Sequence, residues 1–151
     1  MQHLIPFRFA QQWFAIEADY VEQILGEQSY MLVPGAPPLF PGVTAWRGRA
    51  TAILNLSKLL PEDSPVPESH EGEDRRRRTL IVHYQGSTAA IPADEVREAL
   101  PREAAQLRPL HVSRVRFSGS EFEFLGTIAV VLDLRALLHH ILGGAEPGER
   151  R

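Results

Sequence analysis

The chain has 151 residues, of which 44% are hydrophobic and 23% are charged, and its formal net charge is -3. This composition is typical of a globular protein with one or two small cores, and the net negative charge excludes a general field for binding nucleic acid. The absence of cysteine excludes disulfides, thiol nucleophiles and thiolate metal sites. No stretch approaches the ~20 apolar residues of a membrane span, and the N-terminus does not resemble a signal peptide. We therefore expect a cytoplasmic protein.

The N-terminal segment predicts a β-hairpin followed by a short helix. FRFAQQWFAIE alternates apolar and polar residues around Gln11–Gln12, a pattern typical of two antiparallel strands joined by a turn. Asp19 is a candidate helix cap, Glu22 completes a capping box, and the apolar residues of YVEQIL form one stripe. Gly26 would end this helix.

A second hairpin is predicted in VTAWRGRATAILNL, residues 43–56, with its turn at Gly48. Two charged residues, Arg47 and Arg49, interrupt this otherwise apolar pair of strands. The arginines are therefore either part of the turn or a contact with another molecule.

The stretch PEDSPVPESHEGED, residues 61–74, predicts an exposed linker. It contains three prolines, six acidic residues and almost no large apolar group, so it has little to bury. Four arginines follow at Arg75–Arg78, and the neighbouring acids offset their charge. We expect a solvated loop over residues 61–78 rather than a nucleic-acid site.

Two sequence patterns occur twice, in the same order on either side of the linker. AIEADYVEQIL (Ala15–Leu25) and AIPADEVREAL (Ala90–Leu100) share A-I-x-A-D-x-V-x-x-x-L at an offset of 75 residues. AILNLSKLL (Ala52–Leu60) and VVLDLRALL (Val130–Leu138) share L-[N/D]-L-x-x-L-L at an offset of 78. The chain is therefore predicted to consist of two related halves.

The regular spacing of short strands predicts an all-β fold with two small sheets or barrels that pack on each other. The N-terminal barrel is expected at about residues 4–60 and the C-terminal barrel at about 79–138. Neither half is long enough to be comfortably stable alone, so we expect the two to pack on each other. Asp94 is expected to cap a second short helix. A terminal helix is expected over about 134–142, and a disordered tail over 143–151.

The duplication separates what the second hairpin needs for folding from what it does not need. At the offset of 78 residues, Gly48 matches Gly126 and Trp46 matches Phe124, so the glycine and the aromatic ring are shared. Leucine stands where the first copy has Arg47. The turn therefore does not require this arginine.

No motif for catalysis or metal binding is present. The six histidines are scattered, and the sequence lacks a nucleophile elbow, a P-loop, a dinucleotide fingerprint and H-E-x-x-H. Glu121 and Glu123 share one strand face, which we interpret as a solvated outer face because phenylalanines take the other. We expect no enzyme, no metal and no cofactor, although catalytic residues that converge only in space leave no sequence signal.

A binding module remains, and Trp46 and Arg47 are residue types enriched in interface hot spots. An alternative for Trp46 is a role in the core, as its match to Phe124 indicates. Nothing comparable accounts for Arg47.

Six fragments resemble, in the correct order, the CheW-like domains of bacterial chemosensory systems. They extend over about residues 4 to 140 and are FAIEADYVEQI (14–24), VPGAP (33–37), GVTAWRG (42–48), AILNL (52–56), ADEV (93–96) and VLDLRALL (131–138).

The resemblance implies a single domain, residues 1–142, built of two SH3-like five-stranded β-barrels with short helices around a shared core. It implies a non-catalytic adaptor that couples methyl-accepting chemoreceptors to a CheA-type histidine kinase. In that family the receptor's helical hairpin tip docks in a groove between the barrels, and the kinase's homologous regulatory domain docks end to end on a barrel. We expect a monomer alone, assembling in arrays, with no nucleic acid and no membrane insertion. The expected partner-binding residues are Val21, Gln23, Ile24, Trp46, Arg47, Gly48, Arg49 and Val96.

Three departures from the family pattern raise the hypothesis of a divergent, accessory member with a weakened kinase contact. Gln23 stands in place of the usual glutamate, Ala52 in place of proline and Asn55 in place of aspartate. If the glutamate ordinarily pairs with the arginine, Gln23 leaves Arg47 freer to meet an external carboxylate. A scaffold of another pathway that binds a helical partner without any kinase remains an alternative.

Overall fold

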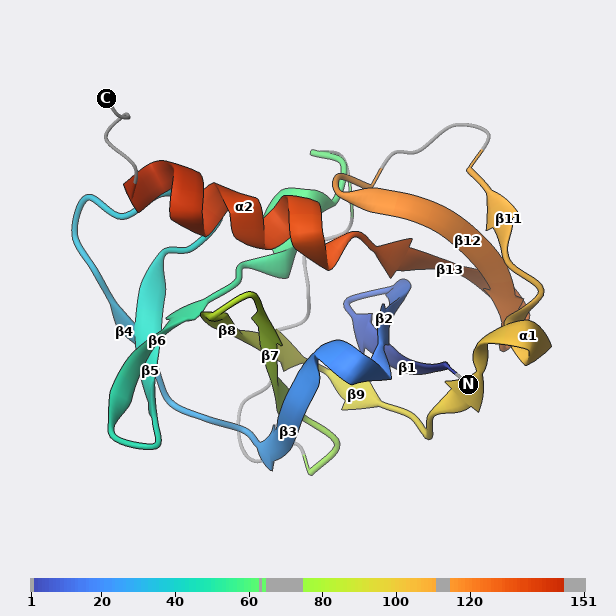
Figure 1. The fold of residues 1–151 in the computed structure, drawn as a ribbon, viewed down its shortest axis with the longest axis horizontal. Coiled ribbons are helices and arrows are strands. Elements are labelled where there is room, and N and C mark those ends of the chain that lie inside the picture. Colours follow the sequence, from blue (N-terminus) through green and yellow to red (C-terminus); the bar gives the residue numbers. More distant parts are fainter. Residues whose placement is uncertain (1, 63, 65–74, 111–114, 146–151) are drawn as a thin grey trace.

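The computed structural model describes residues 2–62, 64, 75–110 and 115–145 (Figure 1). Its elements are β1 (His3–Phe9), β2 (Gln12–Glu17), the 3-10 helix η1 (Ala18–Tyr20), β3 (Val21–Gly26), β4 (Met31–Leu32), β5 (Gly42–Trp46), β6 (Arg49–Ile53), the 3-10 helix η2 (Leu56–Leu59), β7 (Arg78–Tyr84), β8 (Ser87–Ala93), β9 (Glu95–Val96), β10 (Leu100–Pro101), α1 (Arg102–Ala105), β11 (Arg108–Pro109), β12 (Ser118–Phe124), β13 (Thr127–Leu132) and α2 (Leu134–Ala145).

The strands form two sheets, which confirms the predicted all-β class. Sheet A has the order β10-β1-β2-β13-β12-β11, with β9 also paired to β1, and sheet B has the order β3-β7-β8-β6-β5-β4. They lie side by side in Figure 1, and α2 lies along the top of sheet B, starting near the end of β13. No helix among the described residues is long and apolar enough to cross a membrane.

Each sheet combines strands from both halves of the chain. The first hairpin, β1–β2, joins the C-terminal strand β13, and the hairpin β7–β8 joins β6 of the N-terminal half. The expected division into a barrel of residues 4–60 and a barrel of residues 79–138 is therefore wrong. Sequence repeats show that two segments are alike, but only tertiary pairing decides whether each half keeps its own hairpin or exchanges it.

The exchange obeys the internal duplication residue by residue. The parallel pairing of β2 with β13 places Phe14 beside Val130, and that of β8 with β6 places Ala89 beside Ala52. Phe14 and Ala89 are separated by 75 positions and Ala52 and Val130 by 78, the offsets of the two sequence repeats. The antiparallel pairs β3–β7 and β9–β1 are related in the same way. The predicted duplication is therefore a structural one.

A shared core lies between the sheets, as expected. Strand β2 is apolar on both faces: Phe14 and Ile16 join the shared core, whereas Trp13 and Ala15 join a smaller cluster on the other side of sheet A. Helix α2 continues from β13 of sheet A but packs against β7 and β8 of sheet B. Its core residues therefore tie the two sheets together.

In each half a short helix was expected after the first hairpin, and neither helix is formed. Residues Val21–Gly26 are strand β3, hydrogen-bonded to β7, and the corresponding second segment contains β9 and β10. A helix of one or two turns is unstable by itself, so pairing with a neighbouring strand overrides the capping pattern. The turn of the first hairpin lies at Ala10–Gln11, one residue earlier than expected.

The terminal helix is confirmed and is longer than expected, because α2 continues to Ala145. The side-chain oxygen of Asp133 accepts a hydrogen bond from the backbone N–H of Ala136 at 3.1 Å and caps its first turn. Asn55, the equivalent residue of the first half, accepts from the N–H of Ser57 at 3.1 Å and caps η2. The end of the predicted tail, 146–151, and most of the predicted linker lie outside the described residues.

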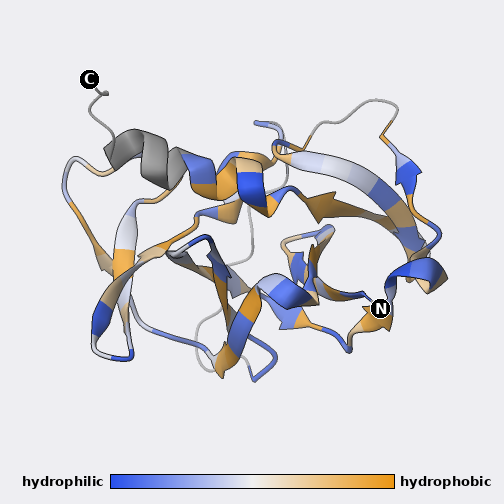
Figure 2. Ribbon diagram, viewed as in Figure 1, coloured by the Kyte–Doolittle hydropathy of each residue, from blue (hydrophilic) through white to orange (hydrophobic). Residues whose placement is uncertain are grey.

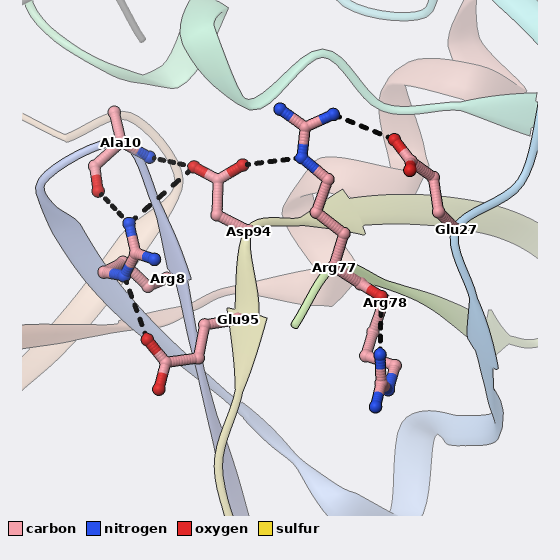
Figure 3. A network of polar contacts seen from close by, with 7 residues as sticks. All are labelled: Arg8, Ala10, Glu27, Arg77, Arg78, Asp94 and Glu95. Atoms are coloured by element: carbon pink, nitrogen blue, oxygen red, sulfur yellow. Dashed lines mark hydrogen bonds and ion pairs between the residues drawn. The ribbon is translucent and has the colours of Figure 1, made fainter. Parts of the chain in front are cut away.

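A cluster of charged side chains joins the sheets where the linker ends (Figure 3). Asp94, between β8 and β9, accepts a hydrogen bond from the N–H of Ala10 at 2.8 Å and lies 3.9 Å from Arg8 and 3.8 Å from Arg77. Arg77 also donates to Glu27 at 2.8 Å. Arg77 is therefore part of a partly buried ion cluster and not, as predicted, of a solvated loop.

Glu95, next to Asp94, belongs to the same cluster. Burial raises its pKa, but hydrogen bonds from Arg97 and Arg8 outweigh the burial and hold the pKa below its ordinary value.

Candidate functional site

The two equivalent hairpin turns have nearly the same backbone conformation. Arg47 and Gly48 have φ angles of 50° and 74°, and Leu125 and Gly126 have φ angles of 50° and 78°. Two successive residues with positive φ are typical of the tight turns that match the right-handed twist of a hairpin. Since leucine and arginine occupy the same turn position, the backbone does not select the arginine.

Trp46 is partly a core residue and partly a site residue. Its ring packs on the outer face of sheet B, against the cluster of Ile53, Ile81 and Ala90. Its indole N–H donates a hydrogen bond to the side-chain oxygen of Gln23, at 3.0 Å. Packing and hydrogen bond together fix the plane of the ring.

Arg47 lies at the surface and stacks on this ring. Its side chain is 62% exposed, its guanidinium carbon lies 4.5 Å from the Trp46 ring centroid, and its Nη1 lies 3.5 Å from Oε1 of Glu22. The expectation that Gln23 leaves Arg47 freer of an acid is therefore wrong, because Glu22 is the acid and Gln23 serves Trp46. Sequence reasoning assigned Glu22 to a helix cap and so missed it.

A β-bulge explains how Glu22 reaches the turn. In the pairing of β3 with β7, Val21 is opposite Val82 and Gln23 is opposite Ile81, so Glu22 is the extra residue. A bulge re-aims side chains relative to a regular strand. On its other side, the Glu22 carboxylate lies 3.5 Å from Nε2 of His83.

The structure thus brings together Gln23, Trp46, Arg47 and Gly48 among the predicted partner-binding residues, and Arg49 follows them at the start of β6. Ile24 is exposed on β3. The remaining two are not part of this surface. Val21 packs against the shared core. Val96 packs there too, in sheet A, opposite Phe7.

A second exposed surface was not predicted, and we name it the β4 surface: Tyr30, Met31, Leu32 and Val33. Met31 is 70% and Leu32 65% exposed, and among the described strands β4 pairs only with β5, at the edge of sheet B. Figure 2 colours this edge as hydrophobic. The sequence did contain a signal for this surface: the apolar run YMLV stands between the polar GEQS and the turn residues PG.

The β4 surface is held close to β5 and continues toward the arginine turn. A side chain at Gly42 would collide with the carbonyl oxygen of Met31, so only glycine allows this approach. A shallow hollow of about 470 Å³ beside β4 is lined by Tyr30 and Met31 and also by Gly48 and Arg49. One face of the hairpin β5–β6 therefore links an apolar edge to a cationic tip.

The described residues contain no group of three His, Cys, Asp or Glu that could hold a metal ion. Glu121, one of the two candidate acids on β12, is paired with Arg108 at 2.9 Å.

Comparison with known proteins identifies the scaffold. The model of the CheW-like domain family matches residues 3–142, so the chain belongs to this family. Its structure is similar to that of the scaffolding protein TtCheW from Thermoanaerobacter tengcongensis, with a TM-score of 0.72 and 18% sequence identity over 88% of this chain and 84% of that chain. A search of curated proteins found no match. The chain is thus a scaffolding or adaptor domain of a family without catalytic activity, and it is not an enzyme.

Proposed function

We propose that this protein couples chemoreceptors to a CheA-type histidine kinase in the cytoplasm, with the Arg47 turn in the receptor contact. The observation that carries the proposal is that Arg47 is exposed on a turn whose equivalent copy folds with leucine. A guanidinium stacked on a fixed indole is held ready to meet a carboxylate, which reduces the entropy lost on binding. The helical hairpin tip of a chemoreceptor is the partner that family membership suggests.

We assign the kinase contact to the β4 surface. Its equivalent edge in sheet A is β11, since the partners of β4, Gly42 and Val43, lie 78 positions before the partners of β11, Ser120 and Glu121. That edge carries Arg108 and Pro109. Charge and proline are typical protections of an exposed strand edge, whereas methionine and leucine leave an edge ready for pairing or apolar contact.

Such contacts are expected to be small, of about 1,000 Å² in total, and to gain strength by repetition in an array. The protein alone is expected to be a monomer. The β4 surface argues against a complete loss of the kinase contact, and Asn55, which caps η2, does not need the charge of the family's aspartate.

Arg47→Glu is expected to weaken binding to a purified receptor hairpin fragment by about tenfold or more, because it replaces attraction to a carboxylate by repulsion. Isothermal titration calorimetry measures the effect. The matched control is Leu125→Glu, which places the same charge on the equivalent turn of sheet A and should leave receptor affinity within about twofold. A wild-type protein that binds no receptor fragment would rule out the coupling function.

Met31→Glu is expected to weaken binding to the kinase regulatory domain by about tenfold, since a charge would be buried in an apolar contact. Receptor binding should not change, so the two variants separate the two surfaces. Failure of the wild-type protein to bind the regulatory domain, with receptor binding intact, would favour the scaffold of another pathway. Equal kinase binding by wild type and Met31→Glu would remove the β4 surface from the proposal.

A further inference from the structure

We propose that Glu22 is an internal stand-in for the partner's carboxylate: it holds Arg47 in the free protein and is displaced when the partner docks. This inference rests on the proposed function, because it names what competes for the same guanidinium. It assigns Glu22 as a residue that sets the affinity of the site.

The geometry around Arg47 is that of an occupied but replaceable contact. The ion pair with Glu22 is 3.5 Å long, and the two side chains are 62% and 39% exposed. At that separation and exposure an ion pair contributes little to stability and exchanges readily with another acid. Stacking on the Trp46 ring, 4.5 Å from its centroid, is a second contact of the same guanidinium.

Folding does not require the pair. In the second copy, Leu125 replaces Arg47 and forms the same turn, as the φ angles show. The residue 75 positions after Glu22 is Arg97, which follows β9 and pairs with Glu95 at 3.1 Å rather than with the turn. The acid and the arginine thus occur together in one copy only, the copy that carries the candidate contact.

The position of Glu22 is defined by two elements. The bulge in β3 turns it toward the hairpin, and His83 on β7 lies 3.5 Å from its second oxygen. Gln23, the next residue, is engaged with the Trp46 indole. Glu22 therefore stands one residue earlier than the glutamate of the family pattern. From this position it pairs with Arg47, while Gln23 holds the Trp46 ring.

Docking then exchanges the carboxylate of Glu22 for that of the partner. The free energy of binding is therefore reduced by the loss of the internal ion pair. Removing that pair should strengthen partner binding, the opposite of what is expected when a contact residue is lost. The predicted sign distinguishes a competing residue from a direct partner contact.

The test is the affinity of Glu22→Gln for the receptor hairpin fragment. We expect binding about two- to fivefold tighter than wild type at low salt, with the difference fading as salt is added. The matched control is Glu121→Gln, which makes the same change of charge at an ion pair of sheet A and should leave affinity unchanged. In an Arg47→Ala background, Glu22→Gln should have no effect.

A measurement on the free protein distinguishes release of the Arg47 side chain from a general effect of net charge on binding. The side-chain Nε–H signal of Arg47 in NMR relaxation should show a more mobile guanidinium in Glu22→Gln and an unchanged one in Glu121→Gln. Equal or weaker receptor binding by Glu22→Gln, with wild-type binding intact, would overturn this inference alone. Absence of wild-type binding would overturn the proposed function and this inference with it.

Discussion

Asp94→Ala is expected to lower the free energy of unfolding by about 3 kcal/mol, measured by urea denaturation. Its side chain is 13% exposed and stands between Arg8 of β1 and Arg77 at the end of the linker. Without the carboxylate both guanidiniums lose a counter-charge, and the N–H of Ala10, in a turn with a φ of 55°, loses its acceptor. The buried Nε of Arg77 already has no hydrogen-bond acceptor. Loss of the nearby Asp94 carboxylate would leave this nitrogen without a counter-charge as well.

Asp94→Asn separates charge from hydrogen bonding, because an amide oxygen can still accept from the Ala10 N–H. We expect about half of the loss seen with alanine. Glu121→Ala is the comparison for a single ion pair, with the half-exposed Arg108 at 2.9 Å, and should cost no more than about 1 kcal/mol. If Asp94→Ala costs no more than Glu121→Ala, the cluster does not join the sheets in the way described.

Neither half of the chain is expected to fold alone, whereas the two halves should fold together. A fragment of residues 1–62 lacks the strands that β2, β3 and β6 pair with, and a fragment of residues 75–151 lacks the corresponding partners. Each would leave sheet edges and most of the shared core exposed. Mixed in equal amounts, they should give a complex of one copy of each, with the circular dichroism spectrum of the intact chain.

The control is the intact protein carrying a protease site between residues 62 and 75, which should remain one particle on size exclusion after cleavage. Cooperative unfolding of either fragment in isolation would contradict the exchanged arrangement. That result would instead support the sequential barrels that the repeats first suggested, so the experiment decides between the two topologies.

The duplication shows how one scaffold acquires two different surfaces. Both halves have the same pairing, the same turn and a cap at the equivalent position, Asn55 or Asp133. They differ at the turn, where Arg47 faces solvent in one copy and Leu125 in the other, and at the edge, where β4 is apolar and β11 is not. Residues that the fold requires are shared, and we place the proposed contacts where the copies differ.

The sequence by itself determined the β class, the two halves and the hairpin turn, and it singled out Arg47, whose contact with a partner stays a prediction. Alternating apolar residues, repeats and a glycine at a turn are local signals, because they reflect the geometry of a few neighbouring residues. The same local reasoning was wrong for the segment after each first hairpin. A capping box in the first segment and a cap at Asp94 in the second indicated helices there. In the first, hydrogen bonds to a strand some 60 residues away formed β3 instead.

Only the tertiary structure decided which hairpin belongs to which sheet, that Arg77 pairs with Asp94 and that Glu22 is the acid of Arg47. Each of these depends on segments far apart in the chain: Arg77 meets Asp94, and the bulge at Glu22 exists only against β7. The two copies carry the same pattern, so a hairpin fits either half equally well by sequence. The choice depends on the free energy of packing both sheets around one core, which no local pattern contains.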